Sequence, residues 1–185
     1  ASRVKYNLGI KNNNCVAYDL IFGCPGWVQG LIQADAFIKA GLAKKCLVIG
    51  SETLSRVVDP YDRDSMIYSD GAGACVLEEN NSVPKGILGF ADQSYTAEEA
   101  YFLFYGSSYN PNETQTTNYI KMHGRKIYEF ALNNVPLAMK AALDKTGIGI
   151  EKVKKVLIHQ ANEKMDEAII NRFYQLYEME TPENI

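Results

Sequence analysis

Residues 18–30, YDLIFGCPGWVQG, change from an apolar run to a helical pattern at the tetrapeptide GCPG. The apolar run begins upstream, and residues 15–22, CVAYDLIF, predict a buried strand. After the turn, apolar side chains recur at the spacing of one helix face: Trp27, Leu31, Ala34 and Ile38. Gly41 suits the position just beyond the end of that helix. The stretch therefore predicts a strand that turns sharply into a helix, with Cys24 at the junction.

Four further segments support an α/β organisation. Residues 45–52, KCLVIGSE, and 71–79, GAGACVLEE, predict short buried strands. Residues 153–162, VKKVLIHQAN, predict a third buried strand that leads into a helix. The amphipathic residues 124–147 predict a helix with a kink or a break at Pro136. The order strand, helix, strand indicates an α/β fold with a sheet that is largely covered on both faces.

The middle of the chain has a different character. Residues 80–86, NNSVPKG, are rich in turn formers, and residues 92–117 are rich in Tyr, Ser, Asn and Thr without a regular period. We therefore expect three parts, namely residues 1–84, a connecting segment 85–118, and residues 119–185.

Composition excludes several classes of function. A net charge of −3 gives no sign of a nucleic-acid partner, and no apolar run approaches the ~20 residues of a membrane span. The N-terminal residues lack the layout of a signal peptide. The four cysteines form no CxxC pair, so we expect neither a metal site nor a redox dithiol. The sequence predicts a cytoplasmic protein with reduced thiols.

Cys24 is the candidate nucleophile. A helix N-terminus exposes unpaired backbone N–H groups, which favour ionisation of a nearby thiol, and the thiolate is the reactive form. Pro25 suits the first helical position, and Gly23 and Gly26 permit a sharp turn without side chains that crowd a substrate. The alternative interpretation is a turn that happens to contain a core cysteine.

His159 is the candidate partner of Cys24. It is one of two histidines, and it stands at the end of a predicted strand, where sites gather in open α/β sheets. Cysteine with histidine is a known nucleophilic arrangement. The alternative is a hydrogen-bonded histidine at a strand end, followed by Asn162 as the cap of the next helix.

Five segments together resemble one family. YDLIFGCPGW, LVIGSETLS, DPYDRDSMIYSDGAGACVLEE, MHGRKIYEFAL and VLIHQAN follow the order seen in β-ketoacyl-acyl-carrier-protein synthase III, a condensing enzyme of the thiolase superfamily. The resemblance extends from about residue 3 to 184 and is weakest over residues 92–117. It implies a thiolase-like layered α-β-α-β-α architecture, of which this chain is an internal fragment without the N-terminal and C-terminal parts.

The resemblance also implies a mechanism. Cys24 takes an acyl group from acyl-CoA as a thioester, and its backbone N–H holds the oxyanion. Malonyl-acyl-carrier protein then loses carbon dioxide, and the carbanion attacks the thioester while His159 stabilises the developing charge. Arg63 matches an arginine near the CoA adenine, where a guanidinium can stack. Asp70, Gly71 and Gly73 match a loop beside the active site, with a structural role.

The chain departs from the family pattern at several positions. The Gly-Asn-Ser/Thr-Ser motif that provides a second donor is absent, so we expect that this segment alone does not complete condensation. Phe22 and Trp27 are bulkier than the usual neighbours of the cysteine, and they either reshape the acyl pocket or pack into the core. Lys164 keeps a positive charge that suits an acidic carrier protein, whereas Glu129 stands where a lysine is common.

The leading expectation is thus a dimeric acyltransferase of fatty acid biosynthesis. One alternative is a CoA-dependent condensing enzyme of secondary metabolism or a relative of hydroxymethylglutaryl-CoA synthase. The other is a non-catalytic module kept for dimerisation or scaffolding, and the presence of both Cys24 and His159 argues against it.

Overall fold

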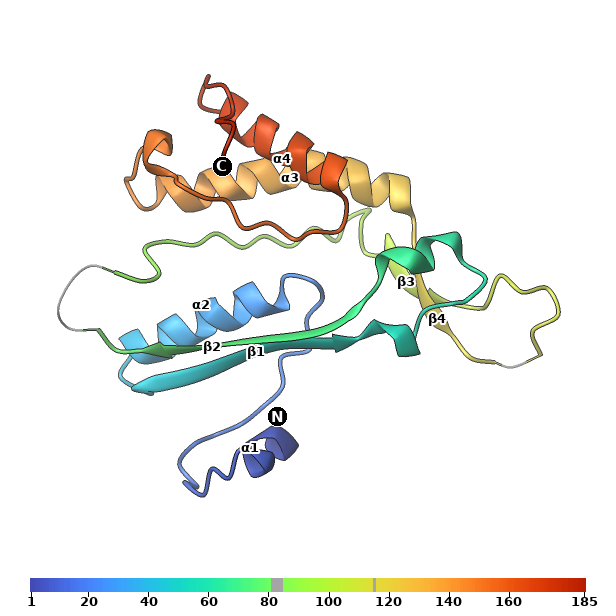
Figure 1. The fold of residues 1–185 in the computed structure, drawn as a ribbon, viewed down its shortest axis with the longest axis horizontal. Helices are drawn as coiled ribbons and strands as arrows, with labels where there is room; N and C mark the ends of the chain where they lie inside the picture. Colours follow the sequence, from blue (N-terminus) through green and yellow to red (C-terminus); the bar gives the residue numbers. More distant parts are fainter. Residues whose placement is uncertain (81–84, 115) are drawn as a thin grey trace. The chain divides into compact units, whose positions relative to one another are not determined.

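The structure is a computed structural model that describes residues 1–80, 85–114 and 116–185. Two compact units are present, and their elements are labelled in Figure 1. The first unit contains Ala1–Gly50 and Ala74–Glu79, and the second contains Ser51–Gly73 and Asn80–Ile185. The expected boundary at residue 84 lies outside the described residues, and the expected division into three parts stays a prediction.

The first unit is built around one helix and a two-stranded sheet. It contains α1 (Ser2–Asn7), α2 (Gly26–Lys39) and most of the sheet in which β1 (Lys45–Thr53) pairs with β2 (Asp70–Glu78). Residues 51–53 and 70–73 of the two strands belong to the second unit. Within this unit α2 packs closely on β1, because a Cβ atom at Gly30 would lie 2.8 Å from Val48 Cγ1. Likewise a Cβ atom at Gly50 would lie 3.1 Å from Trp27 Cβ. Glycine on each side therefore lets the helix approach the strand.

Helix α2 confirms the pattern expected after the GCPG turn. Gly41 follows the C-cap residue Ala40 and has φ +70°, a conformation that favours glycine and ends the helix as predicted. At the other end, Pro25 is the N-cap rather than the first helical residue, so the predicted start is wrong by one position.

The second unit combines a hairpin with a helix pair. Strand β3 (Leu103–Gly106) runs antiparallel to β4 (Tyr119–Met122), with Leu103 opposite Met122. Helix α3 (Gly124–Asp144) packs against α4 (Glu163–Gln175), as Figure 1 shows. Three short 3₁₀ turns complete the described elements: η1 (Leu54–Arg56), η2 (Arg63–Ile67) and η3 (Ile150–Lys152). The core of this unit is formed by Ile150, Phe173 and Tyr174.

Helix α3 continues through Pro136, so the break that we considered at this residue is wrong. Proline cannot donate the hydrogen bond that the carbonyl of Leu132, four residues earlier, would otherwise accept. Arg172 of α4 replaces that donor, because its Nη1 lies 2.9 Å from Leu132 O and 3.0 Å from Asn133 Oδ1. The contact that satisfies the carbonyl therefore also ties α4 to α3.

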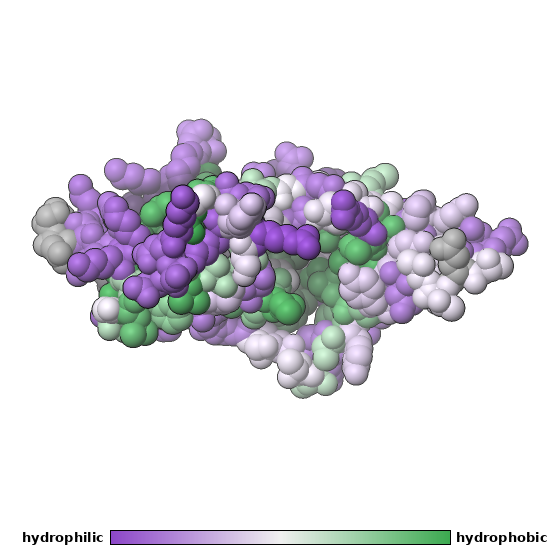
Figure 2. Space-filling view, turned by 90° about the horizontal axis from the view of Figure 1, so that it is seen from below, coloured by the Kyte–Doolittle hydropathy of each residue, from purple (hydrophilic) through white to green (hydrophobic). Residues whose placement is uncertain are grey.

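Two predicted strands are wrong. Residues 15–22 and 153–160 carry no strand assignment in the described structure. Ile21 is 99 % exposed and Leu157 is 97 % exposed. Figure 2 shows apolar surface in green beside hydrophilic surface on one face of the molecule. A strand needs backbone hydrogen bonds from a neighbouring strand, which an apolar pattern alone does not supply. Strands β1 and β2 form as expected, but their side chains are exposed or only partly buried, so the predicted covered sheet is also wrong within the described residues.

Candidate active site

Cys24 lies in a tight turn directly before α2. The backbone N–H of Gly26 donates to Gly23 O at 2.8 Å, so residues 23–26 form a β-turn with Cys24 and Pro25 at its centre. The carbonyl of Pro25 then accepts from Gln29 N at 3.0 Å and starts the helical hydrogen-bond pattern. Because proline also restricts the backbone of the residue before it, the turn constrains the backbone of Cys24.

Cys24 differs from the other three cysteines in its accessibility. Its side chain is exposed, whereas Cys15, Cys46 and Cys75 are partly buried, and all four thiols are free. The thiol of Cys46 lies 3.9 Å from Ala34 O, and burial raises the pKa of that thiol. Cys46 is therefore a packing residue, and Cys24 is the one exposed thiol of the four.

The neighbours of Cys24 have different roles. No atom lies within 4 Å of a Cβ placed at Gly23, so a side chain at this position would point into open space. At Gly26 a Cβ would lie 3.3 Å from Phe22 Cβ, so this glycine allows the chain to turn closely on itself. Trp27 packs on Gly50 of β1, which supports the packing interpretation of its ring.

His159 is exposed and precedes α4 by a few residues. Asn162 is the N-cap of this helix, and its side-chain oxygen accepts from Met165 N at 3.1 Å, which confirms the capping role. One buried carboxylate oxygen of Asp166 has no hydrogen-bond partner within the described structure. Burial raises the pKa of Asp166, and the charge of His159 acts in the opposite direction.

The two candidate catalytic residues belong to different units. Cys24 lies in the first unit and His159 in the second. Their approach to one another therefore stays a prediction, as do their catalytic roles.

The two candidate binding residues both lie in the second unit. Arg63 is the first residue of η2, its side chain is 95 % exposed, and its Nε lies 3.6 Å from Asp64 Oδ1. Lys164 is exposed in the first turn of α4. Glu129, at the position where a lysine is common in the family, forms an ion pair with Arg125 at 2.9 Å along α3.

Asp70 has the structural role that we expected, although it begins strand β2 rather than lying in a loop. Its carboxylate accepts from Ser55 Oγ at 2.6 Å and from Ser55 N at 2.8 Å. These two hydrogen bonds, with a smaller contribution from Arg56, hold the pKa of Asp70 below its usual range.

Sequence reasoning missed a buried ion pair in the second unit. Asp59 and Lys121 are 0 % and 2 % exposed and bind one another. The available signal was a lysine within the otherwise partly buried strand β4, because an unpaired lysine is rarely buried.

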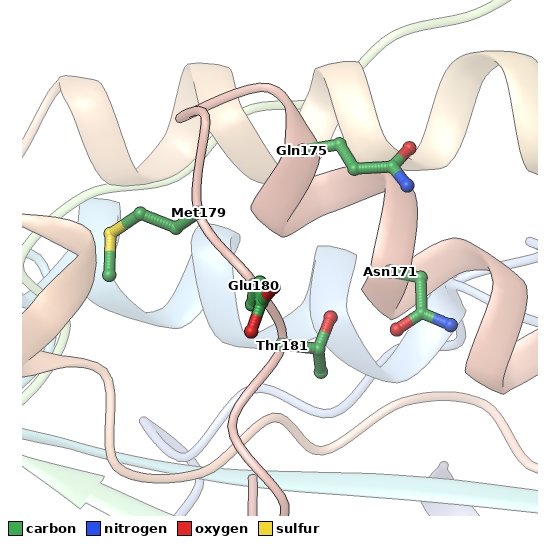
Figure 3. A pocket seen from close by; sticks show the side chains of 5 residues that line it. All are labelled: Asn171, Gln175, Met179, Glu180 and Thr181. Atoms are coloured by element: carbon green, nitrogen blue, oxygen red, sulfur yellow. The ribbon is translucent and has the colours of Figure 1, made fainter.

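Pockets beside α3 and α4 are lined by residues of the second unit, and none of the candidate residues lines them. A pocket of about 250 Å³ at the end of α4 is lined by Asn171, Gln175, Met179, Glu180 and Thr181 (Figure 3). Among the described residues, no cluster of three or more His, Cys, Asp or Glu side chains has the geometry of a metal site. The described helices are too short or too polar to cross a membrane.

Comparison with known proteins shows what the chain is similar to. Residues 18–95 match the family model of 3-oxoacyl-[acyl-carrier-protein] synthase III. The β-ketoacyl-[acyl-carrier-protein] synthase III of Erythrobacter litoralis is 36 % identical over 171 residues, which is 91 % of this chain and 52 % of the relative. The chain is related to the synthase III family. The resemblance inferred from the motifs is thereby confirmed.

Solved structures agree on the fold. The synthase III from Thermus thermophilus is 34 % identical with a TM-score of 0.79 and covers 94 % of this chain, which matches 53 % of that structure. The synthase III from Pseudomonas aeruginosa is 28 % identical with a TM-score of 0.81, over 94 % of this chain and 52 % of that structure. The expected thiolase-like α/β fold is therefore confirmed. The chain spans about half the length of the relatives that it matches.

Proposed function

We propose that the protein carrying this chain is a 3-oxoacyl-acyl-carrier-protein synthase III-type condensing enzyme that initiates fatty acid synthesis. The observation that supports this proposal most strongly is the exposed Cys24 thiol, in a tight turn before α2 of a chain related to that family. A packing cysteine has no need of such exposure, as the partly buried Cys46 illustrates.

The first step is acyl transfer to Cys24. The thiolate attacks the thioester carbonyl of acyl-CoA, the carbon–sulfur bond to CoA breaks, and CoA leaves with the proton that Cys24 lost. Arg63, whose side chain is 95 % exposed, binds the nucleotide end of CoA. No cofactor takes part in this reaction.

The second step is decarboxylative condensation. Malonyl-acyl-carrier protein loses carbon dioxide, the resulting carbanion attacks the acyl thioester, and the Cys24 thiolate leaves as the 3-oxoacyl product forms. His159 donates a hydrogen bond to the thioester oxygen, where negative charge develops. Lys164, exposed on the first turn of α4, offers positive charge to an acidic carrier protein. The dimeric state and the cytoplasmic location included in the proposal depend on the family resemblance alone.

Intact-mass spectrometry after brief exposure to a panel of acyl-CoAs tests the proposal. We expect one acyl adduct on the wild type, the same adduct on Cys46→Ala, and none on Cys24→Ala. The Cys46 variant is the matched control because it also removes one thiol from the same unit. An adduct that persists in Cys24→Ala would overturn the assignment of the nucleophile.

The alternatives give other outcomes in the same experiment. A scaffold module forms no adduct with any donor. A CoA-dependent condensing enzyme forms the adduct but condenses it with malonyl-CoA or another acyl-CoA rather than with malonyl-acyl-carrier protein, so both acceptors are offered to the acylated protein.

A further inference from the structure

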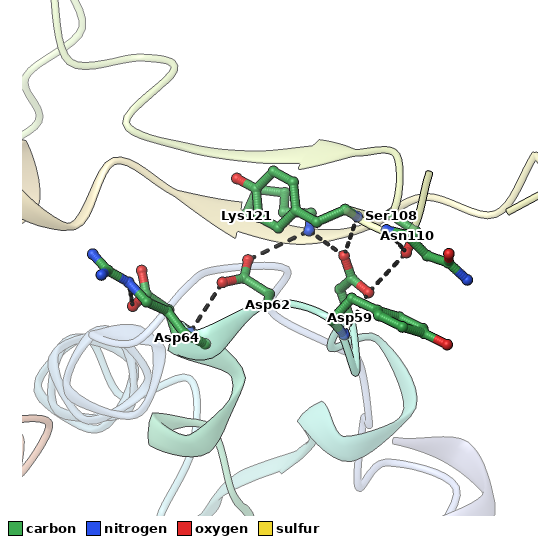
Figure 4. A network of polar contacts seen from close by, with 9 residues as sticks. Asp59, Asp62, Asp64, Ser108, Asn110 and Lys121 are labelled. Atoms are coloured by element: carbon green, nitrogen blue, oxygen red, sulfur yellow. Dashed lines mark hydrogen bonds and ion pairs between the residues drawn. The ribbon is translucent and has the colours of Figure 1, made fainter. Parts of the chain in front are cut away.

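The buried ion pair of the second unit is part of a larger polar network (Figure 4). Lys121 Nζ lies 2.5 Å from Asp59 Oδ2 and 3.4 Å from Asp62 Oδ2. It also lies 3.5 Å from the centre of the Tyr109 ring, within range of a cation–π interaction. One buried cation thus contacts three side chains from two separate segments.

The carboxylate of Asp59 is fully bonded. In addition to Lys121 it accepts from Tyr61 N at 3.0 Å, Ser108 Oγ at 2.9 Å and Tyr109 N at 2.7 Å. Burial raises the pKa of Asp59, but these hydrogen bonds outweigh burial and leave the pKa below its usual range. Burial similarly lowers the pKa of Lys121, while its two carboxylate partners produce a net increase. Both groups are therefore charged at neutral pH.

The network extends to the turn that precedes Arg63, the residue that we propose binds CoA. The backbone N–H of Asp62 donates to Asp59 O at 3.0 Å, which closes a turn over residues 59–62. The Asp62 side chain then accepts from Asp64 N at 3.0 Å and caps η2, whose first residue is Arg63. Lys121 binds the carboxylates at both ends of this turn. Arg63 directly follows the residue at the second of these ends.

Stability alone is a weak reason for such a network. Replacement of a buried ion pair by apolar residues of similar volume is often neutral or stabilising. A fixed backbone is useful at Arg63, because its exposed side chain has only the 3.6 Å contact with Asp64 as an ion pair among the described residues. The turn of residues 59–62 leads directly into Arg63 and limits where its guanidinium can reach.

We infer that Lys121 is a positioning residue, which fixes the turn of residues 59–62 and thereby presents Arg63 to the nucleotide end of CoA. The inference depends on the proposed function, because the role of Arg63 belongs to that proposal. Lys121 itself is buried in the described structure and acts through Asp59 and Asp62 rather than on the substrate.

Two acyl donors separate positioning from a general structural role. Acetyl-CoA carries the nucleotide that Arg63 binds, whereas S-acetylpantetheine has the same thioester without the nucleotide. The rate of Cys24 acetylation is measured against the concentration of each donor in the intact protein. For Asp62→Asn, which keeps an oxygen to cap η2 but removes one charge that faces Lys121, we expect about a tenfold higher half-saturating concentration of acetyl-CoA. The reaction with S-acetylpantetheine is expected to stay unchanged.

Further variants keep the test decisive. Lys121→Met leaves Asp59 without its cation, so its result is used only after circular dichroism has shown a wild-type fold. If Lys121→Met fails to fold, Asp62→Asn alone tests whether the network positions Arg63. Lys140→Met is the matched control, because the contacts of Lys140 in the described structure are with Asp144 and the Tyr177 ring rather than with the turn of residues 59–62.

The outcomes distinguish the two proposals. An equal loss with both donors, or no change in Asp62→Asn, would overturn the positioning role while leaving the acyltransferase intact. A wild-type protein that reacts with neither donor would instead overturn the proposed function itself, and the role of Arg63 with it.

Discussion

The segments that lead to Cys24 and His159 differ from the helices that follow them. Residues 15–22 and 153–160 carry apolar patterns of the kind found in buried strands, yet they form no strand in the described structure. Helices α2 and α4, which begin just after the two candidate residues, match their sequence patterns closely. A helix satisfies its backbone within its own sequence, whereas a strand depends on a neighbour. The comparison therefore separates what local sequence determines from what tertiary pairing determines.

The largest loss of stability that we expect comes from Gly30→Val, which tests how far helix α2 depends on its packing against β1. Even a Cβ at this position would lie 2.8 Å from Val48 Cγ1, so the larger side chain forces α2 away from β1. We expect a loss of about 2 to 3 kcal/mol in the free energy of unfolding, measured with urea. Ala36→Val is the matched control, since it places the same side chain on an exposed position of α2 and costs only about 0.5 kcal/mol.

A second substitution tests whether steric contact between α2 and β1 causes this loss. Val48→Ala in the Gly30→Val background removes the opposing methyl groups and is expected to recover part of the loss. If the double variant is no more stable than Gly30→Val, steric contact between α2 and β1 does not explain the effect, and the helix would depend on β1 less than its packing indicates.

The sequence predicted the parts of the site that depend on short-range rules. The GCPG turn, the end of α2 at Gly41 and the cap at Asn162 all follow from residues within one helical turn of each other. Motif order also predicted the similarity to synthase III, because the spacing of several motifs together is specific.

The remaining features depend on long-range contacts that no local pattern reveals. The continuity of α3 through Pro136 depends on Arg172, which is 40 residues from the carbonyl that it binds. Similarly, Asp59 and Lys121 are 62 residues apart in the sequence. The two predicted strands that do not form illustrate the same limit. Their apolar residues predicted pairing with neighbouring strands, and the described residues provide no such pairing.

Removing the contact between Arg172 and the Leu132 carbonyl is expected to cause a second, smaller loss of stability. Arg172→Ala leaves that carbonyl without the donor that replaces Pro136, and we expect a loss of about 1 to 2 kcal/mol in the free energy of unfolding. In a Pro136→Ala background, the new backbone N–H at residue 136 satisfies the carbonyl, so Arg172→Ala is expected to cost less. The measurement is a double-mutant cycle with urea unfolding.

Arg125→Ala serves as the control for that cycle. It removes an arginine from an exposed ion pair on α3, which contributes no more than about 0.5 kcal/mol. Equal costs for Arg172→Ala in the two backgrounds would show that Arg172 acts through its charge or its packing rather than through the Leu132 carbonyl.

The smallest expected effect tests whether α4 begins through its own sequence. Asn162→Ala removes the oxygen that accepts from Met165 N, and caps of this type contribute about 1 kcal/mol. We expect faster amide hydrogen exchange at Met165 and little change in the middle of the helix, whereas Asn162→Asp keeps the oxygen and preserves the protection. Asn171→Ala, at an exposed position within α4, controls for the change in composition. Unchanged exchange at Met165 would mean that packing against α3, rather than the cap, determines where α4 begins. Helices would then also depend on tertiary contacts, and their contrast with the strands would be weaker than the structure indicates.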